Sequence, residues 1–420
     1  MDLIETFGAK IGALSEEKPQ RARQLLTAGF RANGVKNKLA SKRSSKSDRM
    51  LFQLVNRAMV TCLAKPQSNV MVSLFTPCEM LHLQGLHPYS CEGFSSYLSG
   101  AMAEQPFLHQ AEDTGIPNSL CSYHKVFIGA AQMGLMPKPR FILSPSLACD
   151  ANTLTFRHLA QFYDVPHFNV DIPFESSPQA VDYVAGQLRQ MGEFLTQQTG
   201  LPLDDGQLAR TVARSQRTMA LYHRGLRLRA GRQVLSDLTS ELLRTAAFHF
   251  LLGTPETEAY ARQLLREITT APPAQGKQLL WIHTTPYWVA PLRHLFAQST
   301  RVQVAACDMS YEGIVEADPT KPYEAMARRL VYSPFNGPAQ RRIDRALEMA
   351  KTVGADGAVW FCHWGCKHTL GGARLGKKAL EEAGLPTLLL DGDSCDRGFG
   401  GEGQAATRME AFLEVLEGMA

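Results

Sequence analysis

The sequence predicts an α/β fold with two Rossmann-like parallel-sheet domains, an N-terminal helical segment and a helical connector. The chain has 420 residues, which is more than one compact core usually holds, so two domains are expected. Strand-like apolar runs alternate with helical patterns in residues 70–177 and again in 275–420, and this alternation is typical of βαβ units. Residues 1–69 and 178–274 show helical periodicity without a strand pattern.

Residues 1–69 are expected to form helices, because apolar residues between Met50 and Leu63 recur at helical spacing. Residues 31–49 carry seven Lys and Arg side chains and a single acidic residue, Asp48. We expect this stretch to be a solvated, partly disordered linker. The alternative is a docking surface for an acidic partner or a nucleotide-bearing ligand.

Three strands are predicted in the first α/β domain, at 70–75, 140–144 and 165–170. Thr76 and Pro77 are typical of a helix start, which places Glu79 in the first turn of the helix after the first strand. Further helices are predicted at about 118–133 and 153–162. Residues 93–120 are expected to be largely irregular, since Gly, Ser and Pro interrupt them.

The connector, residues 178–274, carries arginines between its predicted helix faces, and these are expected to be solvated: Arg210, Arg214, Arg217, Arg224, Arg227 and Arg229. In the second domain, residues 275–420, strands are predicted at 278–283, 302–306, 358–361 and 387–390. An amphipathic helix at about 370–382 follows the third of these strands. A last helix is expected at about 405–416.

Composition and charge narrow the class of protein. A net charge of +4 is too small to indicate a nucleic-acid partner for the whole chain. No apolar run approaches the roughly 20 residues of a membrane-spanning helix, and Met1–Glu5 lacks the features of a secretory signal. We therefore expect a cytoplasmic protein without a membrane anchor. Its nine scattered cysteines, none in a C-x-x-C pair, are then expected to be free thiols.

Three of the cysteines occupy equivalent places. Cys121 lies at a predicted helix start, and Cys149 and Cys366 each lie just past a predicted strand. Open α/β sheets bind ligands at such positions, and a helix start also favours the thiolate form of a nearby Cys. Three thiolates from separate loops can hold a 4Fe-4S cluster and leave one iron open to a substrate oxygen. The alternative is that these cysteines are inert, buried apolar side chains.

Short motifs around these cysteines resemble one known family, the 2-hydroxyacyl-CoA dehydratases together with the related benzoyl-CoA reductase subunits. The three cysteine motifs of that family are similar to Ser119–Lys125, Ala148–Asp150 and His363–Lys367. Its closing D-x-D and Q-x-x-T-R-x-E-A-F pattern resembles Asp391–Asp393 followed by Gln404–Phe412. Thr76–Glu79 resembles its T-P-E-E segment, with Cys78 in place of the first Glu. The resemblance covers about residues 70–417.

The resemblance implies one 4Fe-4S cluster on Cys121, Cys149 and Cys366, in an iron–sulfur subunit that pairs with a homologous subunit in a homo- or heterodimer. It implies a radical reaction in which one electron, from a separate ATP-hydrolysing iron–sulfur activator protein, reaches the thioester carbonyl of a 2-hydroxyacyl-CoA. The resulting ketyl radical then expels the hydroxyl group as water. Glu79 is the acid/base candidate, and its alternative role is to complement the helix dipole. The sequence has no Walker-type phosphate loop, so the ATP dependence is expected to come from the partner.

The same resemblance leaves alternatives open. One is an ATP-driven reductase of an aromatic acyl-CoA or another small molecule, and another is a non-catalytic subunit that completes the dimer. Some relatives carry a double cubane with extra paired cysteines in the segment corresponding to Val331–Asn336, which has none here, so a single cluster is expected. The cysteines that remain available for a second cluster are Cys91, Cys307, Cys362 and Cys395, and Cys362 is also a candidate fourth ligand of the first. His283 is predicted either to line the substrate pocket or to be a core residue.

Overall fold

The computed structural model describes residues 3–39, 44–234, 236–311 and 315–419. Within these residues the chain forms two four-stranded sheets that are parallel throughout, which confirms the predicted α/β class. The first sheet has the order β2-β1-β3-β4, with β1 (Asn69–Val72), β2 (His87–Ser90), β3 (Phe141–Pro145) and β4 (His167–Val170). The second has the order β6-β5-β7-β8, with β5 (Lys277–Ile282), β6 (Val302–Cys307), β7 (Gly357–His363) and β8 (Thr387–Gly392). The two sheets therefore share one topology.

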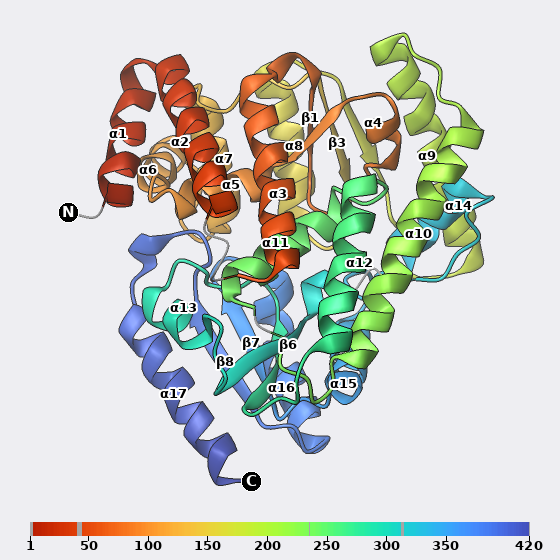
Figure 1. Cartoon of the computed structure of the whole chain (residues 1–420). Coiled ribbons are helices and arrows are strands. Elements are labelled where there is room, and N and C mark those ends of the chain that lie inside the picture. The colour runs from red at the N-terminus through yellow and green to blue at the C-terminus, as the bar shows by residue number, and fades with distance from the viewer. Residues whose placement is uncertain (1–2, 40–43, 235, 312–314, 420) are drawn as a thin grey trace.

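Helices surround both sheets (Figure 1). The N-terminal segment forms α1 (Leu3–Glu17), α2 (Pro19–Leu39) and α3 (Lys46–Ala64). The first domain adds α4 (Glu79–Leu83), α5 (Cys91–Gly100), α6 (Gln105–Asp113), α7 (Ser122–Gln132) and α8 (Asp150–Tyr163). The connector is α9 (Pro178–Thr199), α10 (Asp205–Leu228), α11 (Leu238–His249) and α12 (Pro255–Thr270). The second domain adds α13 (Ala290–Phe296), α14 (Pro322–Val331), α15 (Ala339–Val353), α16 (Lys367–Glu382) and α17 (Glu402–Gly418).

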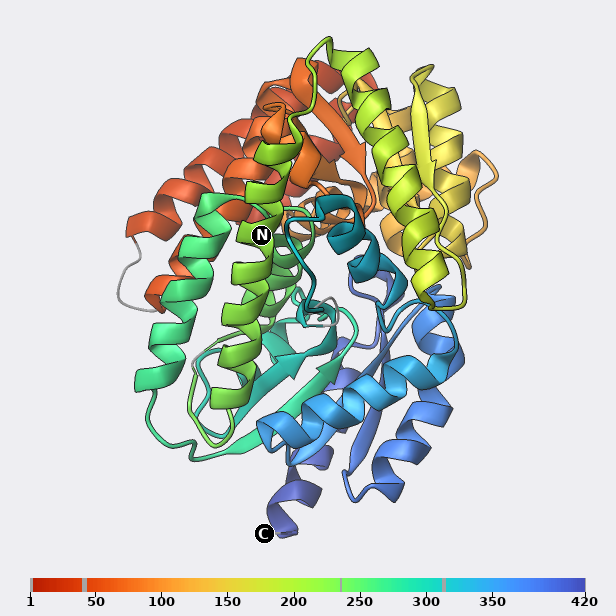
Figure 2. The ribbon, with the colours of Figure 1, turned by 90° about the vertical axis from the view of Figure 1, so that its right-hand side faces the viewer.

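The connector ties the two domains together. Figure 2 shows α10 running along the molecule from the first domain to the second, and α10 contacts α4 of the first domain and α15 of the second. A single apolar core includes Val70 and Phe141 from the first sheet and Leu280 and Ala306 from the second. The sheets therefore pack as parts of one body. No described helix is both long and apolar enough to cross a bilayer.

Two predictions about the first domain are wrong. Strand β2 is absent from the predicted strands because it is a four-residue edge strand that contains Pro88, and Pro weakens a strand pattern. Most of residues 93–120 are helical, in α5 and α6, because tertiary packing buries apolar side chains such as Phe94 and Phe107 despite the Gly and Ser content.

The predicted helix start at Thr76 is also displaced. Helix α4 begins at Glu79 with Cys78 as its N-cap residue, two residues later than predicted. The Thr76 hydroxyl instead donates to the Leu143 carbonyl of β3, at 3.3 Å. Glu79 still lies in the first turn of α4, as predicted.

The basic stretch is helical at 31–39 and 46–49, so the prediction of a partly disordered linker is wrong there. Its basic side chains are mostly exposed, as predicted: Arg31, Lys36, Lys38 and Lys46. Arg31, Lys36 and Lys38 lie on α2, and Lys46 and Arg49 lie on α3. Lys42 and Arg43 fall outside the described residues.

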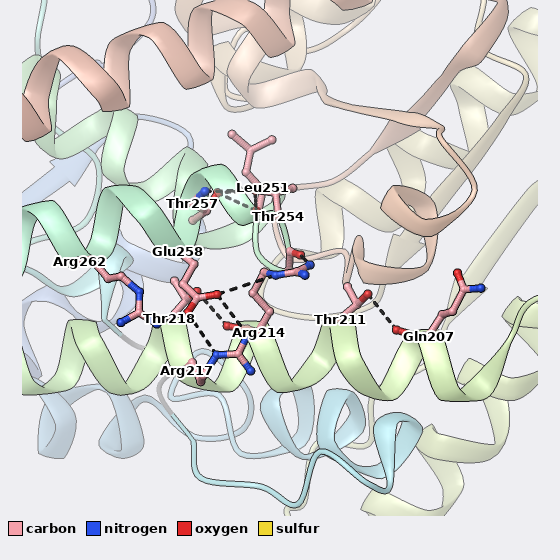
Figure 3. A network of polar contacts seen from close by, with 11 residues as sticks. Gln207, Thr211, Arg214, Arg217, Thr218, Leu251, Thr254, Thr257, Glu258 and Arg262 are labelled. Atoms are coloured by element: carbon pink, nitrogen blue, oxygen red, sulfur yellow. Dashed lines mark hydrogen bonds and ion pairs between the residues drawn. The ribbon is translucent and has the colours of Figure 1, made fainter.

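The connector arginines are mostly exposed, as predicted: Arg210, Arg217, Arg224 and Arg227. Arg214 is half-buried, and the prediction is wrong for Arg229. Figure 3 shows Arg214 and Arg217 of α10 meeting Glu258 of α12, at 3.8 and 3.1 Å. Arg229 is fully buried, donates to the Val304 carbonyl at 2.8 Å and lies 3.7 Å from Glu241. These side chains therefore hold helices together and reach the second sheet.

The closing D-x-D motif has a structural role at the contact between the domains. Asp391 forms a 3.0 Å ion pair with Arg408 of α17. Asp393 accepts a 2.6 Å hydrogen bond from Ser122, at the start of α7, and a 2.7 Å hydrogen bond from the backbone N–H of Cys395. This carboxylate therefore links the end of β8 to the helix that carries Cys121.

Candidate functional site

The carboxyl ends of both sheets face one cavity of about 890 Å³. In each sheet the direction of strand addition reverses between two central strands, β1 and β3 or β5 and β7, and open α/β sheets bind ligands at such points. Residues after these strands line the cavity: Phe75 after β1, Cys149 after β3, His283 after β5 and Cys366 after β7. The shared topology thus directs both switch points toward the same space.

Cys121, Cys149 and Cys366 all line this cavity, and each is the N-cap residue of a helix: α7, α8 and α16. The loop before Cys366 packs tightly against Cys121. Gly365 has a φ of +76°, and a Cβ atom there would lie 2.6 Å from the backbone nitrogen of Cys121. Only glycine permits both the left-handed backbone and this close approach.

Two histidines contact the thiols. The His363 Nε2 atom lies 3.2 Å from the Cys121 sulfur, and the His363 Nδ1 atom accepts a hydrogen bond from the backbone N–H of Ser394. Because Nδ1 accepts, the neutral ring carries its proton on Nε2, which then donates to the Cys121 sulfur. The His124 Nε2 atom lies 3.9 Å from the Cys149 sulfur.

Burial keeps the thiols protonated when no cation is bound. It raises the pKa of Cys121 well above its ordinary value, with the neighbouring Cys366 and Cys149 adding to the rise. Burial raises the pKa of Cys149 to about 12, and it also raises the pKa of Cys366. Backbone N–H groups at the helix starts lower the pKa of Cys149 and Cys366, as expected, but the effect of burial on these pKa values is larger.

The donor set fits a cluster better than a single ion. Among the described residues, no group of three or more His, Cys, Asp or Glu side chains is arranged to hold one metal ion. A 4Fe-4S cube binds each thiolate through a different iron, so its ligands surround a volume and do not meet at a point. Three thiols that line one cavity, from both domains, match that requirement.

The other cysteines do not join them. Within the part of the chain that the structure describes, Cys91, Cys307, Cys362 and Cys395 are absent from the cavity lining. All four are buried, and the Cys362 thiol points to the Trp360 carbonyl, at 3.7 Å.

Glu79 is placed elsewhere. Its side chain is fully buried, and Arg329 binds it through two nitrogens, at 2.7 and 3.0 Å, while Ser215 donates to it at 2.9 Å. Glu79 is not among the described residues that line the cavity. This geometry favours a structural ion pair over the predicted acid/base role.

Most of the cavity wall is aromatic or aliphatic. The aromatic lining residues include Phe75, Tyr97, Tyr123, Tyr287, Trp288 and Phe335. The Tyr97 hydroxyl and the Trp288 Nε1 atom are buried without a hydrogen-bond partner in the described structure. Such a wall accepts an apolar ligand that carries a few polar groups.

His283 combines strain with burial. It has a φ of +86°, which costs energy for a residue with a Cβ atom, and its side chain is only 8% exposed. Its backbone N–H donates to Asp308 at 2.7 Å, which fixes this conformation. His283 lines the cavity, as one of its two predicted roles requires.

The cavity opens beside the N-terminal helices. Its solvent-exposed lining residues come from α1, α2, the end of α5 and α13: Leu3, Ile4, Ala32, Asn33, Lys36, Gly100 and Arg293. Figure 1 draws α1, α2 and α13 on one side of the molecule. Neither Lys36 nor Arg293 takes part in an ion pair with another described residue.

One feature of the site could not be found by sequence reasoning. Glu92, in the first turn of α5, is the one carboxyl group among the described lining residues. The only sequence signal for Glu92 is that it follows a strand, β2, and this strand was not among the predicted ones.

The fold and site define a class: a two-domain α/β protein with one cavity at the carboxyl ends of its two parallel sheets, lined by three free thiols. Sequence comparison then identifies the family. The chain belongs to the 2-hydroxyglutaryl-CoA dehydratase D-component family, whose sequence model matches residues 73–416. It is 22% identical over 337 residues to the alpha subunit of (R)-phenyllactyl-CoA dehydratase from Clostridium sporogenes. The matched segment covers 74% of this chain and 80% of that subunit. The family resemblance is thereby confirmed, and α1–α3 precede the matched region.

Proposed function

We propose that this protein is the iron–sulfur subunit of a 2-hydroxyacyl-CoA dehydratase and holds one 4Fe-4S cluster on Cys121, Cys149 and Cys366. The observation that supports this most directly is that these three thiols, which come from two domains, line one cavity. When bound, the cluster supplies single electrons and an iron that is open to an oxygen ligand.

The chain's own residues support thiolate ligands there. His363 donates from Nε2 to the Cys121 sulfur, and a hydrogen bond to sulfur stabilises the thiolate. Backbone N–H groups at the starts of α8 and α16 do the same for Cys149 and Cys366. These hydrogen bonds suffice to hold the thiolates once a bound cation compensates the energetic cost of burying their negative charge.

The wall favours a bulky, apolar acyl group. Phe75, Tyr123, Tyr287, Trp288 and Phe335 surround a volume that is typical of sites for organic ligands. The relative from Clostridium sporogenes is named for an aromatic acyl-CoA. We therefore propose a 2-hydroxyacyl-CoA with an aromatic or similarly large acyl group as the substrate.

The opening suits the CoA part of such a thioester. Lys36 and Arg293 line the exposed end of the cavity and have no described acidic partner, so they are available to CoA phosphates. The basic N-terminal segment would thus contribute to substrate binding.

Two protein partners complete the proposal. A homologous second subunit is supported by the relative's name, which describes an alpha subunit. A separate ATP-hydrolysing iron–sulfur activator would deliver the electrons, since the sequence has no phosphate loop of its own.

The test is the iron and acid-labile sulfide content of anaerobically purified protein, beside Cys149→Ala and Cys366→Ala. We expect about four irons per chain in the parent protein and a loss of iron in both variants. A cluster that is held by three cysteine ligands is not stably bound when one of them is removed. A Cys362→Ala variant is the matched control and should retain its iron. A folded parent protein without iron would refute the proposal.

A further inference from the structure

The removal of water from a 2-hydroxyacyl thioester requires two proton transfers in addition to any electron transfer. The departing hydroxyl group must receive a proton, and a proton must leave the β-carbon. The cavity therefore needs at least one group that can hold a proton beside the substrate. Glu79, the residue expected in this role, is bound to Arg329 away from the cavity lining.

Glu92 is placed for this role. It is the single carboxyl group among the described residues that line the cavity. It lies at the carboxyl edge of the first sheet, where Ser90 ends β2 and the chain enters α5. It is also close enough to Cys149 for its charge to raise the pKa of that thiol.

The carboxyl group is held in one orientation. The Ser90 hydroxyl donates to Oε2 at 2.7 Å, and the backbone N–H of Leu74, just past β1, donates to Oε1 at 3.3 Å. The nearby Asn152 side chain of α8 lowers the pKa of this carboxyl group. Two adjacent strands thus position this one group.

We propose that Glu92 is the catalytic acid and base of this site, acting on the 2-hydroxyacyl thioester. Its carboxylic acid gives a proton to the oxygen that leaves Cα with the bonding electron pair, which forms water. The resulting carboxylate then takes a proton from Cβ, whose bonding pair completes the Cα–Cβ double bond of the enoyl product. Glu92 ends in its starting protonation state, and no net oxidation or reduction takes place. This inference rests on the proposed dehydratase function.

The surroundings of Glu92 are compatible with both protonation states. Burial raises the pKa of Glu92 above its ordinary value, while the hydrogen bonds from Ser90 and Leu74 and the nearby Asn152 side chain oppose that rise. A carboxyl group whose pKa lies closer to neutrality both gives and takes a proton more readily. The competing role is structural, because an acidic residue in the first turn of α5 also complements the helix dipole.

The experiment compares Glu92→Gln with Glu79→Gln, the same substitution at the residue expected from sequence. Both are studied in the iron-loaded complex with its partner subunit and electron donor. Three quantities are measured: turnover, iron content, and calorimetric binding of 3-phenylpropanoyl-CoA, which lacks the 2-hydroxyl group. Infrared spectra of the protein add a readout that does not depend on turnover, the band of a protonated carboxyl group.

For Glu92→Gln we expect kcat to fall by about 10²- to 10⁴-fold, the usual contribution of an acid/base group, with iron content and thioester binding unchanged. The protonated-carboxyl band should be present in the parent protein and in Glu79→Gln and be lost in Glu92→Gln. Glu92→Asp should recover part of the turnover, because it restores the group at a shorter reach.

Two results would overturn the inference. One is turnover by Glu92→Gln within about threefold of the parent protein, which is far below the effect of removing an acid/base group. The other is a loss of turnover that is matched by an equal loss of iron or of thioester binding, which would show that Glu92 only maintains the site. A parent complex that binds the thioester and holds iron but dehydrates no 2-hydroxyacyl-CoA would refute the dehydratase function, and this inference with it.

Discussion

Replacement of Glu79 by glutamine removes an anionic partner of a largely buried arginine, Arg329. Glu79 is fully buried, and the Arg329 side chain is 12% exposed. Burial by itself would raise the pKa of Glu79, but the charge and hydrogen bonds of Arg329 outweigh it, so the pKa of this carboxyl lies below its ordinary value. Glu79 is therefore an ionised, structural partner at neutral pH.

The size of the effect follows from this geometry. Removal of one member of a buried ion pair typically costs about 3–5 kcal/mol when the remaining charge is left uncompensated. Arg329 keeps some contact with water and a further interaction, and the introduced amide keeps an acceptor oxygen, so we expect at most about 3 kcal/mol. A Tm lower by about 3–4 °C corresponds to this cost, because the unfolding entropy of 420 residues is about 0.9 kcal/mol/K.

The dependence on pH has a definite sign. Since folding lowers the pKa of Glu79, its stabilising contribution is fully present above the ordinary value of 4.5. It is lost as the pH falls through the lower pKa of the folded state. The difference in Tm between the parent protein and Glu79→Gln should therefore be constant at neutral pH and shrink below about pH 4.5.

Thermal unfolding followed by circular dichroism measures this difference. Glu92→Gln is the control, because Glu92 has no buried cationic partner among the described residues, and its Tm should change little. An unchanged Tm for Glu79→Gln together with a loss of turnover of about 100-fold would refute the ion-pair interpretation and restore the acid/base role.

Three further outcomes are expected. Gly365→Ala should lower both the Tm and the iron content, since its φ of +76° and the nearby Cys121 backbone leave no room for a Cβ atom; unchanged iron would contradict this. His283→Asn should raise the Tm by about 2 °C, because Asn tolerates the φ of +86° better, and a fall would show that the imidazole stabilises the fold. The double variant Lys36→Ala/Arg293→Ala should bind 3-phenylpropanoyl-CoA about tenfold more weakly than the parent protein. Its affinity for the matching pantetheine thioester, which has no phosphates, should not change. An equal loss of affinity for both thioesters would show that the two cations do not bind the phosphates.

Much of the architecture could be predicted from the sequence. Strands β5 to β8 are predominantly apolar, so local pattern alone identified them. The two-domain α/β class followed from their alternation with helices. The places of Cys121, Cys149 and Cys366 at strand ends and helix starts were equally local properties. Strand β2 was not, because a short edge strand with Pro88 depends on its pairing with β1 for its conformation.

The assignment of the carboxyl groups depended on the tertiary structure. Glu79 and Glu92 each lie in the first turn of a helix that follows a strand of the first sheet, so local sequence treats them alike. They differ because Arg329, 250 residues further along the chain, reaches one of them, while the other faces the cavity. Local pattern therefore established which residues occupy strand ends. The packing of α14 and α10 against the first domain then settled which of these residues are bound in the core and which line the site, because burial and ion pairing depend on neighbours that are distant in sequence.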